Sequence, residues 1–197
     1  MKPNFGILVL AGGQSSRFGS DKLLAKMSDG RPVIAHSLVP LQAVAKKYQL
    51  NLCVITRPDN QALINYLSAQ TVPYTLCHNA HLGMGHSIAH GIKSNQLWQG
   101  WMICLADMPS LTIKILEALI INIIKQPQQI VRPSVLEKGK EIPAHPVYFP
   151  QQYGFKLSQL TGDDGAKTII KQQTLLRVIN ESCLIDVDTP EVLKGLR

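Results

Sequence analysis

Continuous apolar runs of strand length alternate with segments of helix length along most of this chain. The apolar runs lie at 5–11, 51–56, 72–77, 101–106 and 129–133. The segments with helical spacing lie at 32–48, 60–69, 86–95 and 111–125. Strands that are apolar throughout are typical of a sheet covered on both faces, and strand–helix alternation indicates parallel pairing. The sequence therefore predicts an α/β fold with a mostly parallel, doubly wound sheet flanked by helices.

Length and composition are those of an ordinary globular chain. We expect a single domain over residues 1–197, because a chain of 197 residues can bury a hydrophobic core without disulfides or bound metals to stabilise it. Hydrophobic residues make up 45% and charged residues 17%, which excludes collagen, coiled coil and a disordered chain. The apolar run at 5–11 is too short for a signal peptide, and charges interrupt the run at 113–124, so we expect no membrane span.

The cysteines indicate the compartment. Cys53, Cys77, Cys104 and Cys183 show no C-x-x-C spacing, and three of them lie within apolar runs. Buried free thiols are the expected state of such residues. Disulfides are therefore not expected, and the sequence favours a cytoplasmic location.

A basic balance favours an anionic partner. The net charge is +7, from 20 Lys and Arg against 13 Asp and Glu. The basic residues are scattered, aromatic residues make up only 6%, and no nucleic-acid-binding motif is present. The charge by itself does not choose among nucleic acid, a membrane surface and a phosphorylated small molecule. We expect neither nucleic acid nor a membrane as partner.

The turn after the first apolar run carries glycines and two cations. In the segment at 10–22, Gly12 and Gly13 let the backbone approach a ligand, and consecutive amides there can bind an anion. Arg17 adds a planar fork of donors for phosphate oxygens, and Lys22 adds a point charge. The segment is neither a Walker loop nor a G-x-G-x-x-G turn. It predicts a phosphate-binding turn at the carboxyl edge of the sheet, with a hairpin turn bearing surface charges as the alternative.

Acidic residues follow two other segments. Asp107 comes directly after the run at 101–106, and Mg²⁺ prefers one or two carboxylates together with phosphate oxygens. Asp107 is therefore a candidate metal ligand, with a helix cap as the alternative role. Asp186 and Asp188 have strand spacing that places both on one face. Either could be a second ligand, with Asp188 favoured, although Asp188 could also cap a helix.

Histidines cluster in one segment and one lies apart. His78, His81, His86 and His90 have no acid placed as in H-E-x-x-H and no thiolate spaced to join them, so we do not expect zinc. His145 has prolines on both sides that restrict its backbone. Pocket lining and plain loop structure are both open for His145.

Six segments, in order along the chain, carry a resemblance to a known family. They are LAGGQSSRFGSDKLL at 10–24, GMGHSIAHGI at 83–92, LADMPSL at 105–111, AHPVYFP at 144–150, GDDGAKTII at 162–170 and DVDTPEVL at 186–193. In these segments the chain resembles the molybdenum cofactor nucleotidyltransferases, the MobA-like NTP transferases, which have a Rossmann-like nucleotidyltransferase fold. The later motifs most resemble the cytidylyltransferases that join CMP to molybdopterin. Gly12-Gly13 resembles the guanylyltransferase branch, Phe18 replaces a usual Met, and Ala144 replaces a usual Gly.

The resemblance implies roles for individual residues. The nucleotide pocket would comprise Leu10, Ala11, Gly12, Gly13, Gly83, Met84, Gly85 and Ser87. Arg17 and Lys22 would bind the triphosphate and stabilise the charge that develops on the α-phosphate. Asp107 would hold Mg²⁺, with Asp188 as second ligand. The side toward the acceptor phosphate would comprise His145, Gly162, Asp163 and Gly165.

The implied reaction is Mg²⁺-dependent transfer of CMP from CTP to the terminal phosphate of molybdopterin, with release of pyrophosphate. A recipient molybdoenzyme or its chaperone would be a further partner. A GTP-using guanylyltransferase, a cytidylyltransferase for a sugar or polyol phosphate, and a non-catalytic nucleotide sensor are the alternatives. We expect CTP to be preferred over GTP. Because Gly12 is expected to leave room beneath the base, an alanine there should leave CTP use intact and sharpen the preference.

Overall fold

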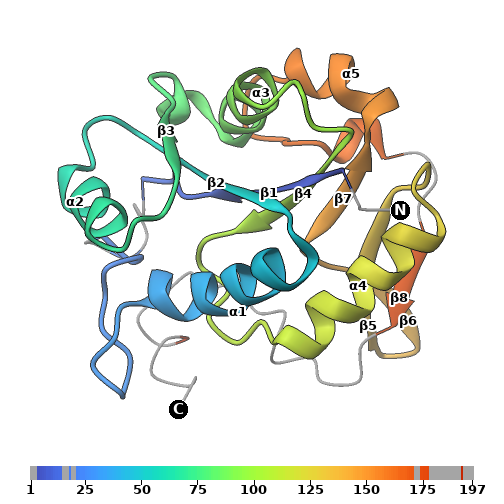
Figure 1. The fold of residues 1–197 in the computed structure, drawn as a ribbon, viewed down its shortest axis with the longest axis horizontal. Helices are drawn as coiled ribbons and strands as arrows, with labels where there is room; N and C mark the ends of the chain where they lie inside the picture. The colour runs from blue at the N-terminus through green and yellow to red at the C-terminus, as the bar shows by residue number, and fades with distance from the viewer. Residues whose placement is uncertain (1–3, 15–17, 19–20, 171–173, 178–191, 193–197) are drawn as a thin grey trace.

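One mixed sheet organises the molecule. The computed structural model describes residues 4–14, 18, 21–170, 174–177 and 192. Within these residues an eight-stranded sheet has the order β3-β2-β1-β4-β7-β5-β6, and β8 pairs with β5 beside this path. Figure 1 shows helices on both sides of the sheet, with α3 and α5 on one side and α1 and α4 on the other. The predicted α/β fold with a mostly parallel, doubly wound sheet is confirmed.

The parallel part of the sheet follows the predicted alternation. Its strands are β1 (Gly6–Leu10), β2 (Asn51–Thr56), β3 (Tyr74–Leu76) and β4 (Gly100–Leu105). Its helices are α1 (Val33–Tyr48), α2 (Gln61–Ala69), α3 (Met84–Ser94) and α4 (Ile113–Lys125). The predicted bounds differ from these by two residues or fewer at each end, and the two extra residues at the start of α3 are Met84 and Gly85.

The second part of the sheet breaks the parallel pattern. It comprises β5 (Val131–Glu137), β6 (Lys140–Pro143), β7 (Val147–Pro150) and β8 (Thr174–Arg177). Strand β7 lies antiparallel between β4 and β5. Short helices complete the described chain: η1 (Ala80–Leu82), η2 (Gln151–Tyr153), α5 (Gly154–Ser158) and η3 (Lys167–Ile169). The sequence did not predict β6, β7 or β8.

Alternate residues of the central strands build two separate cores. Ile7 and Val9 of β1 pack on the face covered by α1 and α4, whereas Leu8 and Leu10 pack on the face covered by α3. Both faces are closed to solvent, and Ile7, Leu8 and Val9 have no exposed surface. This double coverage is the reason that the strand sequences are apolar at every position.

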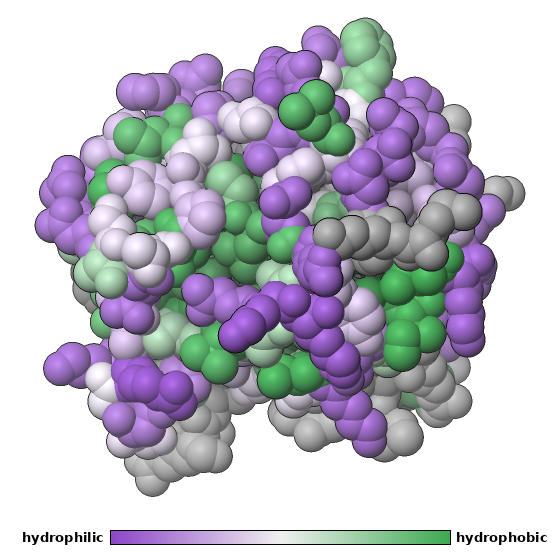
Figure 2. Space-filling view, viewed as in Figure 1, coloured by the Kyte–Doolittle hydropathy of each residue, from purple (hydrophilic) through white to green (hydrophobic). Residues whose placement is uncertain are grey.

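Helix α4 has an apolar stripe wider than the face it buries. Thr112 caps the helix, since its Oγ1 accepts a hydrogen bond of 3.3 Å from the backbone N–H of Ile115. Ile113, Ile121 and Ile124 are more than 40% exposed on its outer side. Figure 2 shows hydrophobic side chains at the surface in the region where Figure 1 places α4.

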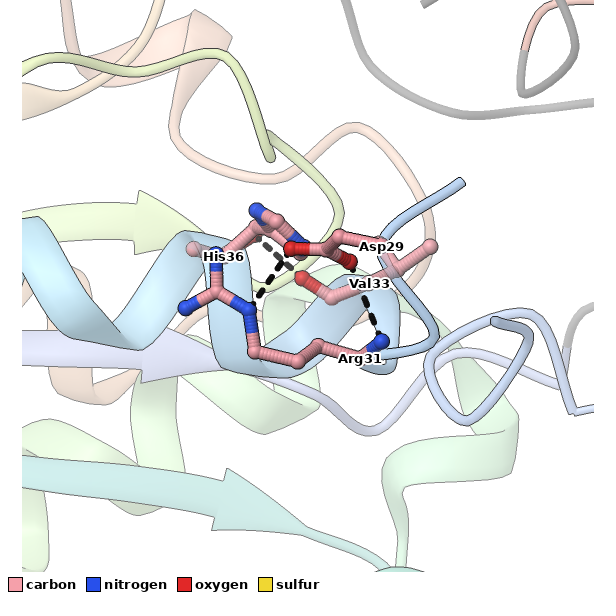
Figure 3. Close-up of polar contacts among 5 residues, drawn as sticks. Asp29, Arg31, Val33 and His36 are labelled. Carbon is pink, nitrogen blue, oxygen red and sulfur yellow. Dashed lines mark hydrogen bonds and ion pairs between the residues drawn. The ribbon is translucent and has the colours of Figure 1, made fainter. Parts of the chain in front are cut away.

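An exposed charge cluster closes the turn before α1. The Arg31 Nε donates to Asp29 Oδ2 at 2.7 Å, and the His36 ring nitrogen Nε2 lies 3.0 Å from Asp29 Oδ1 (Figure 3). The hydrogen bonds from Arg31 hold the pKa of the Asp29 carboxyl well below its usual range. The cluster stabilises the turn and lies on the surface.

The structure bears on two further expectations, that the cysteines are free thiols and that no helix spans a membrane. Cys53, Cys77 and Cys104 are free thiols, and burial raises the pKa of each. Cys183 lies outside the described residues. None of the helices in the described ranges is both long enough and apolar enough to cross a membrane.

Candidate functional site

The carboxyl ends of β1, β2 and β4 meet at one edge of the sheet. Leu10 of β1 pairs in register with Ile55 of β2 and Leu105 of β4. The pairing continues for one residue, because the Ala11 N–H donates to the Ile55 carbonyl at 2.8 Å and the Ala106 N–H donates to the Leu10 carbonyl at 3.1 Å. The glycine turn and the segment that carries Asp107 therefore leave the sheet side by side, as the sequence predicted.

Lys22 and Asp107 form an ion pair across this edge. The Lys22 ammonium donates to Asp107 Oδ2, and the two side chains are only 15% and 14% exposed. Partial burial strengthens this attraction relative to a surface pair. Asp107 does not cap α4, because Thr112 does so. The predicted phosphate-binding lysine and the predicted metal ligand thus lie in contact.

The turn that carries Lys22 is fixed to the start of α2. Asp21 accepts hydrogen bonds from the Leu23 N–H at 3.1 Å and from Asn60 Nδ2 at 2.7 Å. The Asn60 Oδ1 in turn accepts from the Leu63 N–H at 3.1 Å and so caps α2. One buried amide therefore joins the turn to the helix. The sequence did not predict the Asp21–Asn60 hydrogen bond, although an Asn at the start of a predicted helix is a typical N-cap signal.

Gly12 faces protein atoms. A Cβ built on Gly12 would lie 2.9 Å from both the Ala80 Cβ and the Ser87 Oγ. Real Cβ atoms do not approach other atoms that closely, and the Ala80 methyl cannot rotate away. An alanine at position 12 is therefore expected to displace Ala80 or Ser87, which the sequence-based expectation of intact CTP use did not take into account. A Cβ on Gly13, by contrast, would meet no atom within 4 Å.

The segment at 83–85 interlocks with the segment at 161–165. A Cβ on Gly83, whose φ is +119°, would lie 2.4 Å from the carbonyl of Gly162, and one on Gly85 would lie 2.5 Å from the Thr161 oxygen. The Gly85 N–H donates to the Gly162 carbonyl at 2.8 Å, so this amide is already bonded within the protein. Met84 packs against Gly165. The structure thus joins residues that the resemblance divided between the nucleotide and acceptor sides.

A cavity of about 410 Å³ opens beside this interlock. Strands β4 and β7 supply apolar walls, and Asp163, Asp164 and Lys167 form its exposed rim. Its lining includes Met84, His145, Asp163 and Gly165 of the predicted site. It also includes Arg132, which sequence reasoning missed, although a single charge inside the run QIVRP was a visible signal.

His145 is a largely buried, neutral group in this cavity. Burial, reinforced by the positive charge of Arg132, lowers the pKa of His145 to about 4. Its Nδ1 is buried and has no hydrogen-bond partner in the part of the chain that the structure describes. Such an orphaned polar atom indicates that a ligand or water completes the site. His145 therefore lines a pocket, which decides between the two roles left open above.

Three predicted site residues lie outside the described ranges: Arg17, Asp186 and Asp188. The described residues contain no group of three His, Cys, Asp or Glu side chains placed to hold a metal ion. Asp107 with triphosphate oxygens still fits the donor set that Mg²⁺ prefers. His78, His86 and His90 line a different cavity of about 400 Å³ on the outer side of α3.

Comparison with known proteins decides the family. A family model described as the MobA-like NTP transferase domain matches residues 7–178. This chain belongs to that family. Its members are nucleotidyltransferases, so the turn at 10–13 and the Lys22–Asp107 pair occupy the edge of the sheet where a nucleoside triphosphate is expected. No curated protein matches the MobA-like chain in sequence.

Solved structures show the same fold for this MobA-like domain. Rv0371c from Mycobacterium tuberculosis H37Rv matches with a TM-score of 0.80 at 18% identity, over 100% of this chain and 98% of that one. The 4-diphosphocytidyl-2C-methyl-D-erythritol synthase from Anaerococcus prevotii matches with a TM-score of 0.75 at 13% identity, over 99% and 97%. A CMP:2-keto-3-deoxy-manno-octonic acid synthetase complexed with CTP matches with a TM-score of 0.75 at 14% identity, over 98% and 96%.

Proposed function

We propose that this MobA-like domain transfers CMP from CTP to the terminal phosphate of molybdopterin and releases pyrophosphate. The observation that carries the proposal is the Lys22–Asp107 pair at the carboxyl edge of the sheet, beside the glycine turn of an NTP transferase domain. Two structures of the same fold are named as cytidylyl enzymes, which supports CTP as the donor. The cytidylyltransferase-like motifs at 83–92 and 162–170 support the choice of acceptor.

The proposal assigns the two substrates to neighbouring regions. The backbone at 10–13, together with Met84 and Ser87, would contact the nucleotide, and Lys22 with Arg17 would bind its triphosphate. The cavity at His145 would take the acceptor. Its apolar walls suit a flat heterocycle better than a polyol, because a polyol would lose hydrogen bonds to water without regaining them.

Asp107 would hold Mg²⁺, with Asp188 or Asp186 as second ligand. Support for a divalent ion comes from Rv0371c, which has been solved as a manganese complex. When bound, the ion would supply charge neutralisation to the triphosphate oxygens. Asp107 is already held in place by its ion pair with Lys22. Once the Asp107 carboxylate is neutralised by Mg²⁺, the Lys22 ammonium would be able to bind phosphate oxygens.

The chain's own residues then act by positioning and by charge. The acceptor phosphate is itself anionic, so in-line attack on the α-phosphorus needs no side-chain nucleophile. Lys22 and Arg17 would stabilise the charge that develops on the α-phosphate and on the departing pyrophosphate. The turn at 21–23, anchored on Asn60, would keep the Lys22 ammonium in place during the reaction.

The proposal also places the protein in the cytoplasm, where it would pass its product to a recipient molybdoenzyme or to a chaperone of that enzyme.

The proposed reaction is tested by thermal shift with CTP, GTP, ATP and UTP, each with Mg²⁺ and with a chelator. A nucleotide at a hundred times its Kd stabilises the folded state by about 2.7 kcal/mol. We expect the largest Mg²⁺-dependent shift with CTP, and pyrophosphate release only when molybdopterin is added. A larger shift and faster turnover with GTP would contradict the choice of base, and no pyrophosphate release would contradict the reaction.

A further inference from the structure

Two cations line the cavity at His145 within the described residues, and Arg132, which is half-buried, is the less exposed of the two. It lies on β5, next to β7, and its Nε donates to the Ala144 carbonyl at 2.9 Å. Burial lowers the pKa of its guanidinium from the ordinary value. The other cation of the lining, Lys167, lies at the exposed rim.

Within the ranges that the structure describes, no carboxylate forms an ion pair with the Arg132 guanidinium. Asp163 and Asp164 line the same cavity, but neither forms an ion pair with Arg132 in the ranges that the structure describes. A partly desolvated charge without a counter-ion is costly, and a ligand phosphate would supply the missing partner. With Nε engaged, the remaining N–H donors of Arg132 are those that bind a phosphate in the bidentate manner.

The rest of the cavity defines what accompanies the phosphate. Ile103, Leu105, Val147 and Phe149 form apolar walls on the α3 face of the sheet. The neutral ring of His145 adds an Nδ1 that has no hydrogen-bond partner among the described residues. A volume of about 410 Å³ accepts a fused bicyclic ring with a short side chain.

We propose that Arg132 determines acceptor specificity by binding the phosphate of a flat heterocycle seated between β4 and β7. This inference rests on the proposed function for the identity of the acceptor, since a phosphorylated pterin is such a heterocycle. It adds a residue that the family motifs in this sequence do not contain. Arg132 acts on the acceptor alone, and the nucleotide is bound by other residues.

Binding without turnover gives the direct test. The probe is a fluorescent pterin that carries a phosphate ester on its 6-hydroxymethyl group, titrated by fluorescence anisotropy, with the same pterin lacking phosphate for comparison. We expect Arg132→Gln to weaken binding of the phosphorylated probe by about ten- to a hundredfold. Arg132→Lys should bind the phosphorylated probe with an affinity between those of wild type and Arg132→Gln, because lysine keeps the charge and loses the planar fork of donors. Binding of the phosphate-free pterin and of CTP should change less than twofold in both variants.

Arg31→Gln is the matched control. It removes the same charge from an exposed residue that pairs with Asp29, outside the cavity (Figure 3), and should leave every affinity unchanged. In turnover assays, Arg132→Gln should raise the KM for the acceptor and leave the KM for CTP as it is. A general loss of folding would change both, and the CTP titration would show it.

Three results would overturn the inference: equal binding of the phosphorylated probe by wild type and Arg132→Gln, equal binding of the two pterins by wild type, or binding of neither. The CTP shift separates this failure from failure of the proposed function. A protein that binds CTP with Mg²⁺ but neither pterin refutes the role of Arg132 and leaves nucleotidyl transfer intact. A protein that binds the phosphorylated probe through Arg132 but binds no nucleotide refutes the reaction and keeps the cavity assignment.

Discussion

The sheet edge at Lys22 and Asp107 differs from the cavity at His145 in how its charged groups are paired. At the ends of β1 and β4, the Lys22 cation and the Asp107 anion neutralise each other before any ligand arrives. In the cavity between β4 and β7, Arg132 is desolvated with no described counter-ion, and His145 is held neutral beside it. In the proposed function, the first region would exchange partners when a ligand binds, whereas the second would gain one. We therefore expect variants in the first region to alter catalysis, and variants in the second to alter acceptor binding and the pH dependence of stability.

The largest effect should come from Asp107→Asn. The variant keeps the shape of the side chain and loses its charge, so nucleotide binding should no longer depend on Mg²⁺ and turnover should fall about a thousandfold or more. Stability should fall because the mostly buried Lys22 ammonium loses this charged partner, whereas α4 keeps its Thr112 cap. Turnover and Mg²⁺-dependent thermal shift are the measurements, with Glu117→Gln on α4 as control. Retained turnover would mean that Asp107 only serves to hold Lys22.

Lys22→Ala should reduce turnover by about a hundredfold, because the ammonium acts on charge that develops in the transition state. The affinity for CTP should change much less than kcat. Lys47→Ala is the matched control, since Lys47 forms an exposed ion pair with Glu117 at 2.5 Å on the surface. Wild-type kcat in a normally folded Lys22→Ala protein would refute the assignment.

His145 should make the folded state sensitive to mild acid. The unfolded chain takes up a proton near the usual pKa of 6.5, whereas the folded chain resists until about 4, so stability is complete above pH 6.5 and is lost as the pH falls toward 4. After allowance for partial exposure we expect a loss of about 2 kcal/mol. Urea unfolding of wild type and His145→Gln between pH 7 and pH 4 measures it as a difference. Parallel pH profiles for the two proteins would contradict the assignment.

Gly12→Ala should have the smallest effect, about 1 kcal/mol of destabilisation with a few-fold weaker affinity for nucleotide, because the new methyl group meets Ala80 and Ser87. Removing the opposing methyl group with Ala80→Gly should restore part of the loss. Thermal unfolding and CTP titration of the two single variants and the double variant give the coupling. Additive effects would show that the two methyl groups do not meet.

The parallel part of the fold could be predicted because both faces of its strands are buried. Every residue of β1 is apolar, and the run ends where the glycine turn begins. Strand β6 gave no such signal, because most of its residues are exposed, and β7 is only four residues long. The reversal of β7 between β4 and β5 depends on which edge is open after β4, and local sequence does not encode that.

The candidate site likewise has residues that could be predicted from the sequence and residues that could not. Lys22 and Asp107 could be predicted because each follows an apolar run, and such residues share an edge of a parallel sheet. The contact of Gly83 and Gly85 with the segment at 161–165 could not, since nothing in the spacing shows that their backbones touch. Arg132 lies inside a strand, away from the turns where binding residues were sought.

The interlock of 83–85 with 161–165 has a thermodynamic consequence. Because the Gly83 Cα and the Gly162 carbonyl leave no space between them, neither segment can shift without the other. In the proposed function, the segment at 83–85 would border the nucleotide, and both segments border the acceptor cavity, because Met84 and Gly165 both line it. Occupancy of either site would then change the work needed to fill its neighbour. Reciprocity requires the factor by which CTP alters acceptor affinity to equal the factor by which acceptor alters CTP affinity. The two substrates are thus expected to bind cooperatively, through a contact that includes no charged group.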